Sequence, residues 1–151
     1  MASHDSRTPV GIARITAAGG KILGVALVAK SAKNAEKPLP VLKKTARELH
    51  EYFKGRRKHF SVPLDPPGTF FQKKVWTALS KIPYGKTSSY REIARAIGKP
   101  KSVRAVANAV GANPVCVLIP CHRVIGSDGA LTGYAYGLAK KSKLLGLEGV
   151  S

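Results

Sequence analysis

Residues 89–126, SYREIARAIGKPKSVRAVANAVGANPVCVLIPCHRVIG, decide the fold of the second half of this 151-residue chain. Apolar residues recur at helical spacing over 89–97 and again over 102–110, which predicts two short helices. The run 115–119 is apolar and β-branched, which predicts a buried strand. Cys121 and its neighbours would then lie at the C-terminal end of that strand.

Boundary signals separate the two predicted helices. Ser89 and Ser102 can each cap a helix start, because a serine side chain accepts a hydrogen bond from the free backbone N–H groups there. Gly98 can end the first helix, and Pro100 prevents its continuation. This arrangement predicts a helix-turn-helix, although a generic helical hairpin with solvated basic residues has the same outline.

The chain carries a large positive charge. It has 26 Lys and Arg residues against 8 Asp and Glu residues, a formal net charge of +18. This charge indicates an anionic partner, nucleic acid before membrane, with a solvated basic surface as the alternative. Basic and small residues gather around the two predicted helices, where small side chains let a backbone approach a groove closely. We expect double-stranded DNA to contact Lys99, Lys101, Ser102, Arg104, Ala105, Ala107, Asn108 and Arg123.

The first part of the chain has a different pattern. Residues 10–29 contain two apolar, β-branched stretches around Gly19-Gly20, which predicts a hairpin that begins a small sheet. Residues 41–53 predict an amphipathic helix that packs on this sheet through Leu42, Ala46, Leu49 and Phe53.

The proline-rich segment VPLDPPG, residues 62–68, predicts an extended linker. Residues 70–80 then predict a helix with Trp76 in the core. The expected fold class is α/β. A small N-terminal α/β lobe with a short sheet spans 1–62, a linker spans 63–68, and a mainly helical C-terminal domain with the helix-turn-helix and Cys121 spans 69–151.

The sequence predicts an intracellular protein. No apolar run reaches bilayer length, so no membrane partner is expected. The N-terminal residues lack the basic end and uninterrupted apolar stretch of a secretory signal. We expect a cytoplasmic, nucleoid-associated protein in a prokaryote or a nuclear one in a eukaryote.

Cys121 has neighbours that favour nucleophilic chemistry. His122 can accept the thiol proton, directly or through a water, and Glu148 is a candidate to orient that histidine. The alternative is a structural buried cysteine, since free cysteine is among the most buried residue types. Zinc is disfavoured, because Cys116, Cys121 and His122 lack a fourth ligand. We expect no metal.

A nucleophilic cysteine close in sequence to a DNA-binding element suggests chemistry on a DNA base. Such chemistry requires that the base leave the stack. Arg104, near the start of the second helix, can fill the space that the base leaves, and Tyr90 can hydrogen-bond or push the flipping nucleotide.

These residues carry a family resemblance. The motif PCHRVIG at 120–126, with Asn113-Pro114 upstream, closely resembles the active-site signature of the O6-alkylguanine-DNA alkyltransferases. The similarity covers residues 68–149 and includes GTFFQ (68–72), IPYGKT (82–87), RAV (104–106) and LTGY (131–134). The first lobe resembles the family's N-terminal domain only in outline.

The resemblance implies DNA repair by direct reversal. A member flips O6-alkylguanine out of the duplex (O6-methylguanine and also O4-methylthymine) and transfers the alkyl group irreversibly to the residue matching Cys121. In the family pattern, His122 acts through a water and Glu148 completes the relay. Asn113 shapes the hinge between recognition helix and active-site strand, and Arg104 replaces the flipped nucleotide. The implied substrate pocket contains Tyr90, Pro114, Val124, Tyr134 and Ala135.

The resemblance also implies minor-groove binding by a monomer without a cofactor, with cooperative binding along DNA left open. Two other functions compete with the transferase. One is a non-catalytic lesion sensor of the alkyltransferase-like type, in which the nucleophile is replaced. The other is a helix-turn-helix transcription regulator, for which the segment around Cys121 has no purpose.

Four positions depart from the family pattern. Ala107 and Asn108 stand where glycines are usual, Cys116 replaces a proline near the pocket rim, and Tyr136 replaces a glycine. Together these substitutions are expected to narrow the pocket. We expect benzyl groups to be accepted less well than methyl groups.

Overall fold

The computed structural model describes residues 1–150, which divide into two compact units. The first unit comprises Met1–Pro67 together with Pro114–Cys116, and the second comprises Gly68–Asn113 and the chain from Val117 onward. No helix within residues 1–150 is both long and apolar enough to cross a membrane.

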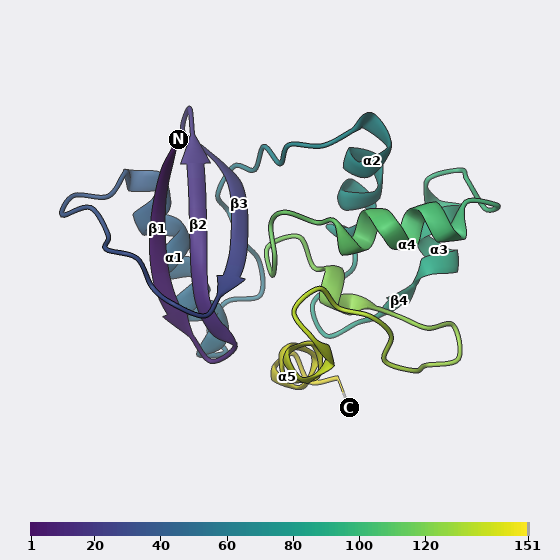
Figure 1. Ribbon diagram of the computed structural model, residues 1–151. Helices are drawn as coiled ribbons and strands as arrows, with labels where there is room; N and C mark the ends of the chain where they lie inside the picture. Colours follow the sequence, from purple (N-terminus) through teal and green to yellow (C-terminus); the bar gives the residue numbers. More distant parts are fainter. Residues whose placement is uncertain (151) are drawn as a thin grey trace. The chain divides into compact units, whose positions relative to one another are not determined.

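An antiparallel sheet of three strands forms the first unit, in the order β1 (Ala2–Thr8), β2 (Gly11–Ala18), β3 (Lys21–Val28) (Figure 1). β2 and β3 form the predicted hairpin. Gly19 and Gly20 make its turn with φ angles of 59° and 77°, a left-handed conformation that glycine adopts without steric cost. β1 was not predicted, because its sequence ASHDSRT lacks an apolar face; it pairs with β2 along its whole length.

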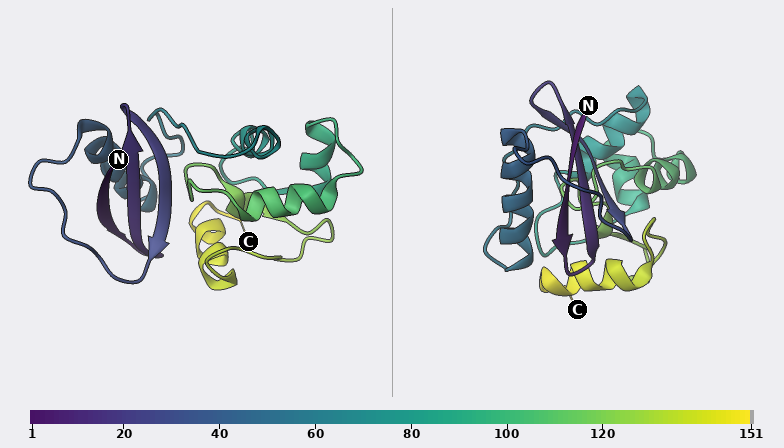
Figure 2. Two further views of the ribbon diagram at one scale, coloured as in Figure 1. Left: turned by 45° about the horizontal axis from the view of Figure 1, so that its top comes forward. Right: turned by 60° about the vertical axis from the view of Figure 1, so that its left-hand side comes forward.

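Helix α1 (Pro40–Phe53) packs on one face of this sheet (Figures 1 and 2). The predicted apolar face is only partly correct, since Ala46 and Phe53 are half-buried. Its buried residues are Leu42, Thr45, Glu48, Leu49 and Tyr52. A charged residue can lie on this face because the Glu48 carboxylate accepts hydrogen bonds from the Ser61 backbone N–H and hydroxyl.

The proline-rich segment is extended, as its composition predicts. It makes one parallel bridge to the sheet, in which the Ile22 N–H donates to the Pro63 carbonyl at 2.9 Å and the Asp65 N–H donates to the Ile22 carbonyl at 2.8 Å.

The second unit begins with α2 (Phe70–Leu79). A capping box fixes its start, because the Thr69 hydroxyl accepts from the Gln72 N–H while the Gln72 side chain accepts from the Thr69 N–H. Trp76 is a core residue, as predicted, with 3% of its surface exposed. Its indole N–H donates to the Ala109 carbonyl at 2.8 Å and so links two helices of this unit.

The predicted helix-turn-helix is present as α3 (Tyr90–Ala96) and α4 (Val103–Gly111). The Ser89 hydroxyl caps α3 by accepting from the Glu92 N–H at 3.1 Å, and Gly98 ends that helix with a φ of 74°. Ser102 occupies the N-cap position of α4, but its side chain makes no capping hydrogen bond, so that prediction is wrong. Its backbone, at φ −103° and ψ 33°, is not in the extended conformation that serine caps adopt.

The predicted strand at 115–119 is also wrong, although all five of its residues are buried. Val115 makes only an isolated bridge to Val25, and Val117 has a φ of 71°, which turns the chain. A single turn of 3₁₀ helix, η1 (Cys121–Arg123), follows and leads into β5 (Val124–Ile125).

Two further elements complete the second unit. Strand β4 (Ser88–Ser89) pairs in parallel with β5, and helix α5 (Leu138–Leu147) packs near η1. The sequence did not predict α5, because Gly137 provides no side-chain cap and the helix contains Ser142 and Gly146, which weaken the helical signal.

Candidate active site

A cavity of about 300 Å³ opens beside Cys121 within the second unit. Three tyrosines contribute to its walls, and the rings of two of them, Tyr134 and Tyr136, meet edge to face at 5.8 Å between centroids. Aromatic walls of this kind suit a planar, partly apolar ligand. The lining residues are Tyr90, Ala107, Asn108, Val110, Gly111, Asn113, Cys121, Gly133, Tyr134, Ala135 and Tyr136.

The pairing of β4 with β5 brings Tyr90 and Cys121 to the same cavity. Ser88 lies opposite Val124, so Tyr90 follows one strand directly while Cys121 comes just before the other. A parallel pair needs a long connection, and here that connection contains the helix-turn-helix. The fold therefore links the helix-turn-helix to Cys121 through one short ladder.

Opposing effects act on the Cys121 thiol, which is partly exposed to the cavity. Burial raises the pKa of Cys121, whereas a hydrogen bond from Asn113 and the positive charge of Lys141 lower it. The Asn113 amide N–H also donates to the Ile119 carbonyl at 2.8 Å, which fixes its orientation. Because burial has the largest effect, the sulfur rests as a thiol and needs a base to react.

His122 has the properties of such a base. It is fully buried, and its Nε2 lies 2.7 Å from Oε2 of Glu148. A carboxylate only accepts, so Nε2 carries the hydrogen and the lone pair is on Nδ1. Nδ1 is buried and has no hydrogen-bond partner among residues 1–150. Burial lowers the pKa of His122, against the effect of Glu148, which favours a neutral ring that can accept a proton.

Arg123 lies in the interior, so the prediction that it contacts DNA is wrong. Its Nε and Nη2 donate to the two carboxylate oxygens of Glu148 at 2.8 and 3.0 Å, and its Nη1 donates to the Ile82 carbonyl at 2.7 Å. The guanidinium also lies 5.7 Å from the ring centroid of Tyr84. Arg123 thereby fixes the carboxylate that orients His122.

Tyr90 keeps a hydrogen to donate. The Thr132 hydroxyl donates to the Tyr90 oxygen at 3.2 Å, so the phenolic O–H can point toward a group in the cavity. Thr132 was not among the predicted site residues, although it lies in the motif LTGY (131–134) that contributes to the family resemblance.

Two residues predicted in the pocket are not on its wall. Pro114 belongs to the first compact unit, where its carbonyl accepts from the Val25 N–H at 2.9 Å. Val124 is fully buried in β5. Cys116 is buried too and does not line the cavity. Of the four departures from the family pattern, only those at 107, 108 and 136 bear on the space beside Cys121.

The other predicted DNA contacts lie on the surface of the helix-turn-helix. Ser102 and Ala107 are half-buried. Ala107 and Asn108 also line the cavity, so the exposed face of α4 continues into the wall of the site. Exposed among them are Lys99, Lys101, Arg104, Ala105 and Asn108. Val110, Gly111 and Gly133 were missed as lining residues, because small and apolar types carry no chemical signal in a sequence.

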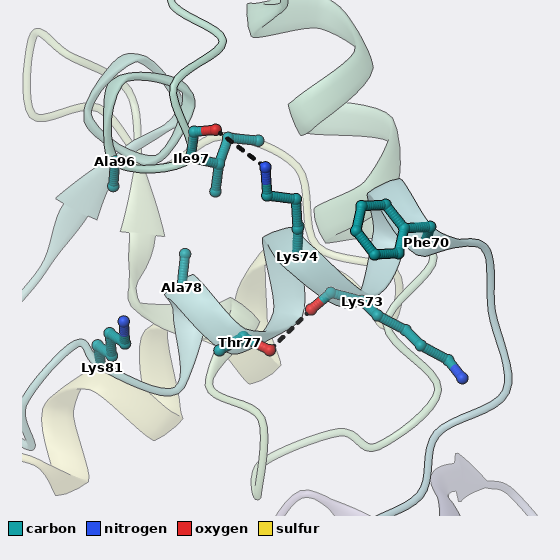
Figure 3. A pocket seen from close by; sticks show the side chains of 8 residues that line it. All are labelled: Phe70, Lys73, Lys74, Thr77, Ala78, Lys81, Ala96 and Ile97. Atoms are coloured by element: carbon teal, nitrogen blue, oxygen red, sulfur yellow. Dashed lines mark hydrogen bonds between the residues drawn. The ribbon is translucent and has the colours of Figure 1, made fainter.

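A second, larger cavity of about 490 Å³ lies along α2 and the end of α3 (Figure 3). Phe70, 83% exposed, and the side chains of Lys73, Lys74 and Lys81 lie around it. The Lys74 ammonium donates to the Ile97 carbonyl at 3.5 Å. Its walls contain no Cys, His, Asp or Glu side chain. Among residues 1–150, no three His, Cys, Asp or Glu side chains group closely enough to hold a metal ion.

Each of the two units matches a known protein-family model. Residues 70–150 match the model described as 6-O-methylguanine DNA methyltransferase, DNA binding domain, and residues 6–66 match its ribonuclease-like domain. The chain belongs to the 6-O-methylguanine DNA methyltransferase family. The resemblance of the motif around Cys121 is thus confirmed, and so is the α/β fold class.

Relatives of this methyltransferase family share the same name. The methylated-DNA--protein-cysteine methyltransferase of Methanosarcina barkeri is 57% identical over 106 residues, which cover 70% of this chain and 67% of that protein. The constitutive methylated-DNA--protein-cysteine methyltransferase of Bacillus subtilis is 49% identical over 124 residues, 81% of this chain and 75% of that protein.

Solved structures of similar fold point to the same family as these relatives. A crystal structure of Mycobacterium tuberculosis OGT in complex with DNA matches with a TM-score of 0.87 and 40% identity, covering 97% of this chain and 91% of that one. S. pombe Atl1 in complex with damaged DNA matches with a TM-score of 0.50 and 38% identity, over 54% of this chain and 77% of that one. The similarity to the methyltransferase therefore extends over much more of this chain.

Proposed function

We propose that this chain repairs O6-alkylguanine in double-stranded DNA by transferring the alkyl group to Cys121. The observation that carries the proposal is a cysteine on the wall of a tyrosine-lined cavity, next in the chain to a buried histidine whose Nδ1 is free to accept a proton. Membership of the methyltransferase family supports it. O6-Methylguanine is the primary substrate, and O4-methylthymine, which carries the same alkyl–oxygen bond, is a second.

The proposed reaction is a single displacement. The Cys121 sulfur forms a bond to the alkyl carbon while the bond from that carbon to guanine O6 breaks, and the bonding electron pair stays on guanine. The thiol proton passes to Nδ1 of His122, directly or through a water, and the imidazolium then releases it to water. Guanine, which leaves as an anion, takes up one proton from water, and Tyr90 donates a hydrogen bond to the ring. The thioether product is not cleaved, so each molecule acts once.

The same proposal covers the DNA contacts. Alkylated guanine enters the cavity from double-stranded DNA whose minor groove receives α4, and the exposed Lys99 and Lys101 contact phosphates. The chain acts as a monomer, and several monomers can bind cooperatively at neighbouring positions along the DNA. It works where the DNA is, in the cytoplasm of a prokaryote or the nucleus of a eukaryote.

Mass spectrometry tests the proposed function directly. After incubation with an oligonucleotide that contains O6-methylguanine, the protein is expected to gain one methyl group on the peptide that contains Cys121. Tight binding without a gain in mass would instead identify a lesion sensor, and no preference for the methylated duplex would favour a transcription regulator.

Arg104→Ala is expected to slow alkyl transfer more than it weakens binding to unmodified duplex. Arg104 is exposed near the start of α4, where it can occupy the space left by the flipped base. Losing about 1.4 kcal/mol of compensation for unstacking would lower the rate about tenfold. Single-turnover transfer and duplex affinity are measured together, with Lys99→Ala as the control, which should mainly reduce salt-dependent affinity. An unchanged transfer rate in Arg104→Ala would show that another residue fills the gap.

Benzyl transfer is expected to be slower than methyl transfer by about tenfold, because an added ring in a closely packed pocket costs at least about 1 kcal/mol. The Tyr136 ring, packed against Tyr134, takes up space where a glycine would leave it free. Single-turnover rates with O6-methylguanine and O6-benzylguanine oligonucleotides measure the ratio. Tyr136→Gly should bring the two rates together, and equal rates in the unmodified protein would contradict the argument.

A further inference from the structure

Lys141 is a buried cation that the proposed reaction does not yet use. It lies in α5 with 0% of its surface exposed. Its ammonium donates to three backbone carbonyls, those of Val124 at 2.5 Å, Thr132 at 2.6 Å and Gly133 at 3.3 Å. All three of its N–H bonds are therefore used, and every acceptor is neutral. Among residues 1–150, no carboxylate forms an ion pair with it.

The three carbonyls belong to two segments that frame the cavity. Thr132 and Gly133 directly precede the pocket residue Tyr134, and Thr132 also holds the Tyr90 hydroxyl. Val124 starts β5, which begins where η1 ends. One ammonium thus fixes the tyrosine-bearing wall relative to the segment that carries Cys121.

The charges around Lys141 leave it without an anionic partner. The titratable groups on which the charge of Lys141 acts are Cys121 and His122, and His122 is in turn held by Glu148 and Arg123. Glu148 is already matched by the bidentate Arg123, and His122 is neutral when it acts as a base. Apart from the Glu148 carboxylate, which Arg123 neutralises, the negative charge that can form among these groups is the Cys121 thiolate.

We propose that Lys141 is a positioning residue that supplies the positive charge against which the Cys121 thiolate forms. The inference rests on the proposed function. The carbonyls hold the ammonium in place before the reaction, so the charge stabilises the sulfur as it loses its proton and no reorganisation is needed. In agreement, the charge of Lys141 lowers the pKa of Cys121, while burial lowers the pKa of Lys141 itself.

The test compares Cys121 reactivity in Lys141→Gln and in the unmodified protein. Glutamine keeps an N–H donor for the carbonyls but removes the charge. Iodoacetamide modifies thiolates, so its rate at Cys121, followed by peptide mass spectrometry across pH, reports the pKa of that thiol. The midpoint of this pH profile, which is the apparent pKa of the Cys121 thiol, is expected to rise by about one pH unit in Lys141→Gln. Methyl transfer at neutral pH should fall about tenfold and recover as the pH is raised.

Two further variants separate charge from structure. Lys143→Gln, which removes the same charge from an exposed position of the same helix, should leave the midpoint unchanged. Lys141→Arg keeps the charge and should hold the midpoint near that of the unmodified protein, even if its melting temperature falls. If Lys141→Gln does not fold, Lys141→Met provides the uncharged variant.

An unchanged midpoint in a folded uncharged variant would overturn the inference, as would an equal rise in Lys141→Arg. The iodoacetamide profile needs no DNA. If the unmodified protein transfers no methyl group, the proposed function is refuted. The iodoacetamide profile would then still test the effect of Lys141 on the Cys121 thiol.

Discussion

Cys121→Ser is expected to abolish alkyl transfer completely while the protein keeps its fold and its affinity for methylated duplex. The serine hydroxyl is close in size to the thiol, but it ionises far less readily than a thiol and is a much weaker nucleophile. Mass spectrometry should show one added methyl group in the unmodified protein and none in the variant. Gel-shift affinities should remain similar, because the walls of the cavity and the surface of α4 are unchanged.

Cys116→Ser is the matched control for this substitution. Cys116 is the other cysteine of the chain, is 1% exposed and does not line the cavity, so the variant should still transfer one methyl group. A methyl group found on Cys116, or on any residue of the Cys121→Ser protein, would contradict the assignment of the nucleophile.

Glu148→Gln is expected to lower both stability and activity. The Glu148 carboxylate accepts from His122 and from two nitrogens of Arg123, all within the interior. A glutamine turns one acceptor into a donor and leaves the buried guanidinium without an anion, which costs about 3–5 kcal/mol. His122 also loses the partner that holds its hydrogen on Nε2. Transfer should slow by about two orders of magnitude or more, as expected when a general base is lost.

Glu36→Gln controls for this change, because Glu36 is exposed and its loss of charge should alter stability by less than about 0.5 kcal/mol. Urea unfolding gives the stabilities, and transfer is measured well below the melting temperature of each variant. A Glu148→Gln protein with normal stability and normal transfer would show that the buried group of His122, Arg123 and Glu148 has no such role.

Local sequence signals predicted the turns and helix ends, whose conformation depends on residues close together in the chain. Gly19 and Gly20 predicted the hairpin, because few other residues tolerate two successive left-handed conformations. Ser89 and Gly98 predicted the limits of α3, because caps satisfy backbone groups within one turn. The motif around Cys121 predicted the family, which the family models confirm over most of the chain.

Long-range contacts decided what the sequence did not predict. The run at 115–119 has the composition of a strand, but it meets no strand over its length and turns at Val117. Arg123 has the chemistry of a DNA contact, yet Glu148, 25 residues away along the chain, neutralises it in the interior. Lys141 is an ordinary helical lysine in the sequence and becomes a buried cation only when three carbonyls meet its ammonium.

By itself, the sequence determined that this chain has a helix-turn-helix and a place in the methyltransferase family, and it predicted Cys121 as the nucleophile, because these depend on residue types at fixed short spacings. The tertiary structure alone decided which nitrogen of His122 is free, which charges cancel and which remain near Cys121. Those properties arise from burial and from pairings between segments distant in the chain, and no local pattern encodes the distance between two such groups.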